Sequence, residues 1–214
     1  MKNKYDAYLF DLDGTLINTI DLIVHGVGHI LPEFTELAPT PDEIRKNVGV
    51  PIKKQFEIYL GNKTGIDLDA VVKKYMEYQL SIWKDYVTLY DGIEELLEEL
   101  HNRGKKMAIV TSRTLYSADL YMQELGIRKY FIAMVTPELT AKHKPDAGPA
   151  LKAAELLGST PDRSVMIGDS IFDIQCGRNA GMTTIFTDWG SFSGSPDDVN
   201  ATFVVHHPRE ILEI

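Results

Sequence analysis

Short apolar segments separated by helix-length stretches constrain the fold of this chain most. Residues 5–10 read YDAYLF, and similar short apolar runs return at 107–111, 131–136, 164–168 and 183–187. Runs of this kind are typical of strands buried on both faces of a sheet. Helical stretches that could return the chain in parallel lie at 91–103, 115–125, 146–158 and 170–180. The alternation predicts an α/β fold with a doubly wound parallel sheet.

One segment, residues 17–86, interrupts this alternation. It contains four helical stretches in succession, at 19–31, 41–48, 51–60 and 67–86. Thr40 and Pro41 form a typical helix start, and Gly49 and Gly61 are typical helix ends. We therefore predict an inserted four-helix domain at 17–86 and an α/β core made of residues 1–16 and 87–214. A further strand at 202–205 and a short terminal helix complete the core.

Charge and composition limit the partners of the protein. The formal net charge is -9, which argues against broad binding to nucleic acid or to a membrane surface. No window holds the roughly 18 apolar residues of a membrane helix, and MKNKYDAYLF lacks the features of a secretory signal. Cys176 is the single cysteine, so no intrachain disulfide can form. We expect a cytoplasmic protein; the sequence does not indicate its oligomeric state.

Two carboxylates follow the first predicted strand, in the stretch DAYLFDLDGT. Ligands of open α/β sheets bind at the carboxyl ends of the strands, where Asp11 and Asp13 lie. Strand alternation places both side chains on one side and Leu12 on the other. Two close carboxylates repel each other, but a hard cation such as Mg²⁺ reverses the sign of that interaction. Gly14 then lets the backbone approach an anion, so the stretch predicts a metal and anion site.

The tripeptide DLD occurs a second time, at 67–69, and provides an internal comparison. Here it follows Gly-Ile and leads into a helical pattern, so Asp67 is predicted to be a helix N-cap and Asp69 a first-turn acidic residue. What distinguishes the first copy is its context, between an apolar strand and Gly-Thr.

Polar side chains also follow the other predicted strands. MAIVTSR ends in Thr111 and Ser112, whose hydroxyl and amide groups suit phosphate oxygens. Lys144 directly precedes Pro145, and GDSIFD places Asp169 and Asp173 where a strand meets a helix. Each feature alone has an ordinary structural explanation, such as Ser170 capping the following helix. Their occurrence at successive strand ends, in this order, indicates a common site.

DLDGT, IVTS, the Lys144-Pro145 pair and GDSIFD together resemble the four motifs of the haloacid dehalogenase superfamily, in its phosphatase branch. The helices of residues 17–86 look like the α-helical cap of that superfamily, so the resemblance covers the whole chain. The stretches KPDAGPALKAAELLG and GDSIFDIQCGRNAGM are most similar to the phosphoglycolate phosphatase and pyrophosphatase group.

This resemblance implies roles for the carboxylates. Asp11 would attack phosphorus and form an aspartyl-phosphate, and Asp13 would act as general acid and then as general base. The metal Mg²⁺ would be held by the Asp11 carboxylate, the Asp13 backbone carbonyl and Asp169, with Asp173 in a supporting position.

The resemblance also implies how the phosphoryl group is held. Thr111 and Lys144 would contact it, and Lys144 would also have a catalytic role by offsetting the charge of the carboxylates. Ser112 and Gly14 complete the predicted substrate-binding set. Lys53 and Lys54, in the cap, are predicted either to lie on a solvated face or to contact an anionic leaving group.

The predicted function is that of a Mg²⁺-dependent phosphoric monoester hydrolase acting on a small phosphorylated metabolite, with phosphoglycolate first and pyrophosphate next. Dehalogenases of this fold lack the second aspartate, which is present here as Asp13. A phosphomutase of the β-phosphoglucomutase type is an alternative, although its cap histidine and arginine would fall at Ile23 and Ile52. A non-catalytic binding protein is disfavoured because Asp11 and Asp13 are both retained.

Overall fold

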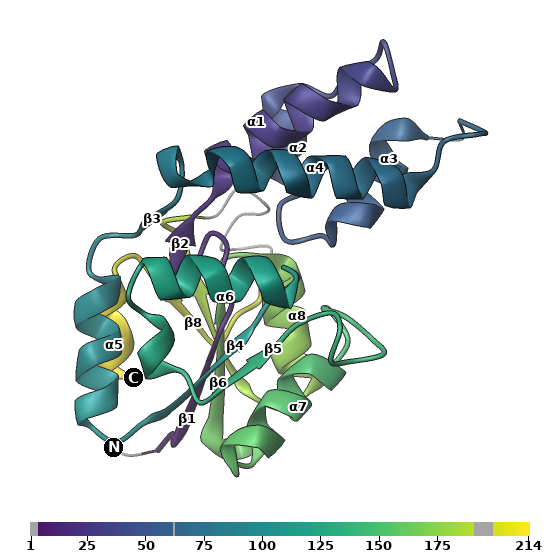
Figure 1. The fold of residues 1–214 in the computed structure, drawn as a ribbon. Coiled ribbons are helices and arrows are strands. Elements are labelled where there is room, and N and C mark those ends of the chain that lie inside the picture. The colour runs from purple at the N-terminus through teal and green to yellow at the C-terminus, as the bar shows by residue number, and fades with distance from the viewer. Residues whose placement is uncertain (1–3, 62, 191–198) are drawn as a thin grey trace.

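The predicted strands form one parallel sheet of six strands in the computed structural model, which describes residues 4–61, 63–190 and 199–214 (Figure 1). The strands are β1 (Ala7–Phe10), β4 (Lys106–Val110), β5 (Ala133–Val135), β6 (Ser164–Gly168), β7 (Thr183–Thr187) and β8 (Phe203–Val205). Their order is β5-β4-β1-β6-β7-β8, with all neighbours parallel. From the central strand β1, later strands extend in both directions, which confirms the doubly wound fold.

Helices cover both faces of this sheet. They are α5 (Ile93–Asn102), α6 (Leu115–Glu124), α7 (Gly148–Leu157) and α8 (Ile171–Asn179). Alternate residues of β1 explain the two layers, because Phe10 packs in one cluster with Leu97 of α5 and Tyr121 of α6. On the other face, Leu9 packs in a second cluster, with Ala153 of α7 and the buried Cys176 of α8. The strands are therefore apolar throughout because both of their faces are buried.

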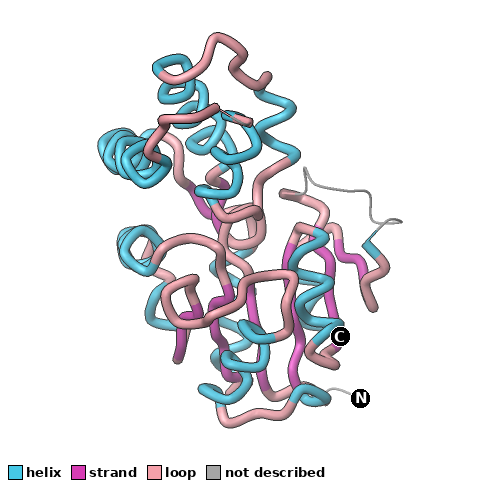
Figure 2. The backbone as a smooth tube through the Cα atoms, turned by 90° about the vertical axis from the view of Figure 1, so that its right-hand side faces the viewer, coloured by secondary structure: helices cyan, strands magenta, loops and turns pink. Residues whose placement is uncertain are grey.

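The inserted helices pack around an apolar cluster of their own. They are α1 (Ile20–Ile30), α2 (Pro41–Lys46), α3 (Ile52–Leu60) and α4 (Leu68–Ile82). Val27, Ile44, Phe56 and Val71 are buried together in this cluster, and the four helices lie as a separate group beyond the sheet (Figures 1 and 2). We propose that residues 17–86 form a cap domain, which this separate apolar cluster supports.

Local sequence signals determine where the cap helices begin. Thr40 accepts a hydrogen bond from the Glu43 amide, and the Glu43 carboxylate accepts one from the Thr40 amide, so α2 starts with a capping box. Asp67 Oδ1 accepts hydrogen bonds from the amides of Asp69 and Ala70, at 3.0 and 3.2 Å. The prediction that Asp67 caps a helix is therefore confirmed.

A two-stranded antiparallel sheet joins the cap helices to the core, and the sequence did not predict it. It pairs β2 (Ile17–Asn18) with β3 (Thr88–Leu89). The Tyr90 amide also donates to the Leu16 carbonyl at 3.2 Å. Two-residue strands carry no periodic hydrophobic pattern, so sequence analysis could not recognise them.

The remaining helical turns are short. They are the 3₁₀ turns η1 (Leu31–Glu33), η2 (Trp83–Asp85), η3 (Arg128–Tyr130), η4 (Pro161–Arg163) and η5 (Pro208–Glu213), the last being the predicted terminal helix. Among the described helices, none combines the length and the hydrophobicity needed to cross a bilayer.

Candidate active site

The polar residues that follow the strands gather at the carboxyl edge of the sheet, on the side that faces the cap. Asp11 follows β1, Thr111 follows β4 and Asp169 follows β6. The amide of Asp11 still donates to the Ile167 carbonyl at 2.9 Å, and that of Thr111 to the Val135 carbonyl at 3.0 Å. The hydrogen bonds of the sheet therefore continue to Asp11 and Thr111 and hold these two residues in place.

Lys144 lies between two carboxylates at the centre of this edge. Its Nζ is 2.7 Å from Asp11 Oδ1 and 2.6 Å from Asp173 Oδ1, and it donates to the Val110 carbonyl at 3.2 Å. Its side chain is 2% exposed. Burial alone would lower the pKa of Lys144, but the charges of Asp11 and Asp173 outweigh burial and raise it. The ammonium therefore stays charged inside the protein.

Asp11, the predicted nucleophile, lies in an environment with excess negative charge. Burial, followed by the charge of Asp173, raises the pKa of Asp11 to about 7, although Lys144 lowers it in part. Burial and the charge of Asp11 likewise raise the pKa of Asp169 well above its usual value. Asp11, Asp169 and Asp173 thus carry more negative charge than the single ammonium of Lys144 balances.

Three of these carboxylates are close enough to share a metal ion. Oxygens of Asp11, Asp169 and Asp173 all lie within 4.8 Å of one another, and all three residues are buried. An oxygen-only donor set fits a hard cation such as Mg²⁺. The structure therefore brings together two predicted metal ligands and the predicted supporting residue.

Asp173 is also part of the local helix structure. Its Oδ2 accepts a hydrogen bond from the Ser170 amide at 3.1 Å, and its own amide donates to Ser170 Oγ at 3.3 Å. This capping box starts α8, so Ser170 is the cap that its position in the sequence indicated. Because both oxygens of Asp173 already accept hydrogen bonds, Asp11 and Asp169 have more freedom to bind a metal ion.

Gly14 lets the loop after β1 pass directly over Asp169. Its φ is +83°, and a Cβ at this position would lie 2.3 Å from Asp169 Oδ2. Thr15 completes the contact, since its Oγ1 donates to Asp169 Oδ1 at 2.9 Å. A side chain at Gly14 would therefore meet one of the predicted metal ligands.

Arg113 is a residue of the site that the sequence analysis missed. It forms a two-point ion pair with Asp13, with Nε 3.1 and 3.0 Å from the two carboxylate oxygens and Nη2 2.6 Å from Oδ1. The Thr19 hydroxyl also donates to Asp13 Oδ1. The Asp13 side chain consequently lies outside the three-carboxylate cluster. A cation directly after Thr111 and Ser112 was the available signal, but its partner is 100 residues away in the chain.

Thr111 and Ser112, two of the four predicted substrate-binding residues, lie beside Arg113. The Thr111 hydroxyl accepts a hydrogen bond from the Arg113 amide at 3.1 Å. The Ser112 hydroxyl donates to the Gly49 carbonyl at 3.0 Å, which connects the core to the loop between α2 and α3. Asp11, Asp13, Thr111, Ser112 and Lys144 all line one cavity, with a volume of about 90 Å³.

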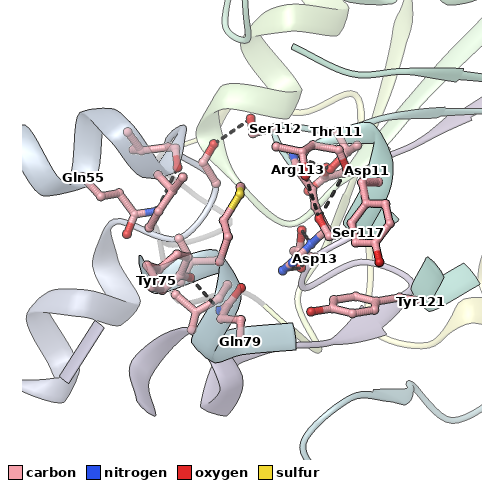
Figure 3. A pocket seen from close by; sticks show the side chains of 18 of the residues that line it. Asp11, Asp13, Gln55, Tyr75, Gln79, Thr111, Ser112, Arg113, Ser117 and Tyr121 are labelled. Carbon is pink, nitrogen blue, oxygen red and sulfur yellow. Dashed lines mark hydrogen bonds and ion pairs between the residues drawn. The ribbon is translucent and has the colours of Figure 1, made fainter. Parts of the chain in front are cut away.

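The cap supplies the opposite wall of this cavity (Figure 3). Gln55, Tyr75 and Gln79 face the core residues across it. Gln79 Nε2 donates to the Tyr75 hydroxyl at 2.6 Å, and Gln55 Nε2 donates to the Val50 carbonyl at 2.8 Å. Gln55 Oε1 is buried and has no hydrogen-bond partner among the described residues.

Lys53 and Lys54 do not line the cavity. Lys53 pairs with Asp69 at 2.6 Å and Lys54 with Glu57 at 2.7 Å, and all four side chains are substantially exposed. Helix α3 presents Ile52 and Gln55 to the cavity instead. Of the two predictions for these lysines, the structure agrees with the solvated face.

Known proteins resemble this chain over most of its length. The family model for haloacid dehalogenase-like hydrolases matches residues 8–187. A PpaX protein of Clostridium perfringens is 37% identical over 209 residues, covering 97% of this chain and 96% of its own. The pyrophosphatase PpaX of Bacillus velezensis is 30% identical over 186 residues, covering 87% of this chain and 84% of its own.

A solved structure has the same fold. That of a predicted phosphoglycolate phosphatase from Haemophilus somnus 129pt superposes with a TM-score of 0.89 at 19% identity, covering 98% of this chain and 97% of its own. The family match over residues 8–187 confirms the expected superfamily. The chain belongs to the haloacid dehalogenase-like hydrolases.

Proposed function

We propose that this protein is a Mg²⁺-dependent phosphatase that acts on a small phosphorylated metabolite through an aspartyl-phosphate on Asp11. The observation that carries the proposal is the buried arrangement of Asp11, Lys144 and Asp169 beside Asp13, at the carboxyl edge of the sheet. Asp11, Asp169 and the Asp13 backbone carbonyl would hold the metal, and Asp173 would support it. Bound Mg²⁺ would supply positive charge to the phosphoryl oxygens in the transition state.

Residues of the chain carry out the remaining steps of the reaction. A carboxylate oxygen of Asp11 forms a bond to phosphorus while the bond to the leaving oxygen breaks. Asp13 donates a proton to that leaving oxygen and then takes one from the water that attacks the aspartyl-phosphate. Lys144 stays beside Asp11 and offsets negative charge, and the Thr111 and Ser112 groups bind phosphoryl oxygens.

Pyrophosphate becomes the first candidate substrate. The sequence motifs placed phosphoglycolate before it, but PpaX proteins are the relatives with 37% and 30% identity, and the Bacillus velezensis protein is named a pyrophosphatase. Phosphoglycolate is the second candidate, supported by the motifs and by a fold shared with the Haemophilus somnus protein. Both candidates are small phosphoryl compounds.

A phosphomutase is less well supported. The positions where mutases of this fold carry a histidine and an arginine are Ile23 and Ile52, and both of these side chains line the cavity. Apolar groups there offer no partner to the second phosphate or the hydroxyls of a sugar phosphate.

The test is phosphate release from pyrophosphate, phosphoglycolate, sugar phosphates and nucleotides, with Mg²⁺ or with EDTA. We expect Mg²⁺-dependent release from pyrophosphate or phosphoglycolate and none from Asp11→Asn. Asp67→Asn is the matched control, because it changes the same residue of the second DLD tripeptide and leaves a good helix cap. Absence of release from every compound by folded protein would refute the proposal.

A further inference from the structure

Arg113 and Lys144 are the cationic side chains among the described residues that line the cavity. Lys144 is already held by two carboxylates, those of Asp11 and Asp173. Arg113 contacts one, that of Asp13. A substrate anion that enters the cavity would therefore find Arg113 the less neutralised of the two charges.

The Asp13 contact does not use every N–H donor of the Arg113 guanidinium. A guanidinium carries five N–H donors in a rigid plane, and Asp13 receives its hydrogen bonds from Nε and Nη2. The guanidinium lies over the ring of Tyr121, 4.8 Å from the ring centroid. The Arg113 side chain is 8% exposed. Buried placement, a stacked ring and a fixed ion pair hold Arg113 in one orientation, which suits recognition of an oxyanion.

The cap wall carries no charge of its own among the described residues. Its cavity-lining side chains include Ile23, Ile52, Gln55, Tyr75 and Gln79. Lys53 and Lys54 lie outside the cavity in surface ion pairs. Any negative charge on the leaving group must therefore be balanced from the core side, where Arg113 stands next to the proposed general acid Asp13.

We infer that Arg113 binds an acidic group on the leaving-group side of the substrate, so that the protein selects small phosphoryl compounds whose leaving group bears a phosphate or a carboxylate. This inference rests on the proposed function, because Asp13 defines the leaving-group side. It assigns substrate selectivity to the core motif that follows β4, and not to a cation of the cap.

Binding of stable phosphonates tests the inference without turnover. Methylenediphosphonate carries a second phosphonate, phosphonoacetate carries a carboxylate, and ethylphosphonate carries no second acidic group. Isothermal titration with Mg²⁺ is expected to give the wild-type protein at least tenfold tighter binding of one or both two-acid compounds than of ethylphosphonate. The compound with the larger preference identifies the acidic group as a phosphate or a carboxylate.

Arg113→Gln is expected to reduce this preference about tenfold or more while changing the affinity for ethylphosphonate little. Arg163→Gln is the matched control, since Arg163 forms an arginine–aspartate pair with Asp6 outside the cavity, and it should keep the preference. If Arg113→Gln does not fold, the double variant Asp13→Asn with Arg113→Gln removes both charges of the pair and is expected to lose the preference likewise.

Three results would overturn the inference: no preference in the wild-type protein, an equal loss of affinity for all three compounds in Arg113→Gln, or a preference that Arg113→Gln leaves unchanged. The second would make Arg113 a positioning residue for Asp13. Failure of the proposed function is a separate outcome, because the binding preference is measured whether or not phosphate is released.

Discussion

The Nζ atom of Lys144 lies 2.7 Å from Asp11 Oδ1, although 133 residues separate the two in the chain. The same ammonium holds Asp173, so one buried cation stabilises two carboxylates at the carboxyl edge of the sheet. This contact connects the first and third motifs and makes the site a determinant of stability as well as of activity.

Replacing Lys144 by methionine should therefore destabilise the metal-free protein. The change leaves Asp11 and Asp173 buried without their cation, and breaking a buried pair in this way costs about 3–5 kcal/mol. Urea denaturation in EDTA measures the free energy of unfolding. Lys54→Met, which breaks an exposed pair with Glu57, should stay within about 0.5 kcal/mol of the wild type. Equal effects of the two substitutions would show that the Lys144 contacts are not important for stability.

Replacing Asp169 by asparagine should have opposite effects on the metal-free and metal-bound proteins. Burial and the Asp11 charge raise the pKa of Asp169, so a neutral amide should leave the metal-free protein as stable or more stable. Mg²⁺ at about 100 times its Kd should stabilise the wild type by about 2.7 kcal/mol, and this increment should disappear in the variant. Thermal unfolding with Mg²⁺ or EDTA checks both effects, with the exposed Asp162→Asn as control. A full Mg²⁺ increment in Asp169→Asn would contradict the assignment of Asp169 as a ligand.

Gly14→Ala should lower the free energy of unfolding by more than the positive φ at this position alone explains. Gly104 also has a positive φ, of +69°, but a Cβ there would meet nothing within 4 Å. We expect Gly104→Ala to lower the free energy of unfolding by about 1–2 kcal/mol. Gly14→Ala should lower it further, because the new Cβ would also collide with Asp169. Denaturation curves of the two variants, together with Mg²⁺ affinity, separate the contributions. Similar costs and unchanged Mg²⁺ binding would mean that the loop moves away from Asp169 without consequence.

His206 should titrate above its usual range because of Asp188. The His206 ring donates a hydrogen bond to the Asp188 carboxylate, and this bond and the negative charge of Asp188 raise the pKa of His206. The native state therefore binds this proton more tightly than the unfolded state. The resulting stabilisation is fully present below the unfolded pKa of about 6.5 and is lost as the pH rises through the raised native value. Titration of the His206 ring by NMR should show Asp188→Asn lowering its pKa, with Asp85→Asn as a distant control; a pKa unaffected by Asp188→Asn would refute the pairing.

Much of the fold follows from local sequence patterns. The apolar runs at 107–111 and 164–168 appear as β4 and β6 within one residue of their predicted bounds, because strands buried on both faces need continuous apolar sequence. Asp67 and Ser170 cap helices as predicted, because capping depends on residues three positions apart.

The motif residues at strand ends were also predictable, since parallel strands place their carboxyl ends at one edge. That rule brings Asp11, Thr111 and Asp169 to the same side of the sheet before any contact is known. Their catalytic and metal-binding roles stay predictions, which the Asp11→Asn and Asp169→Asn variants test.

Tertiary structure alone decided which side chains contact one another. The partner of Asp13 is Arg113, 100 residues away, and no local pattern relates them. Lys53 and Lys54 lie on α3 next to Ile52 and Gln55, yet packing of α3 on α4 turns Gln55 to the cavity and leaves the lysines in surface pairs. Periodicity sets which residues form helices and strands, whereas the face that a helix presents and the charge that meets a carboxylate depend on how the elements pack.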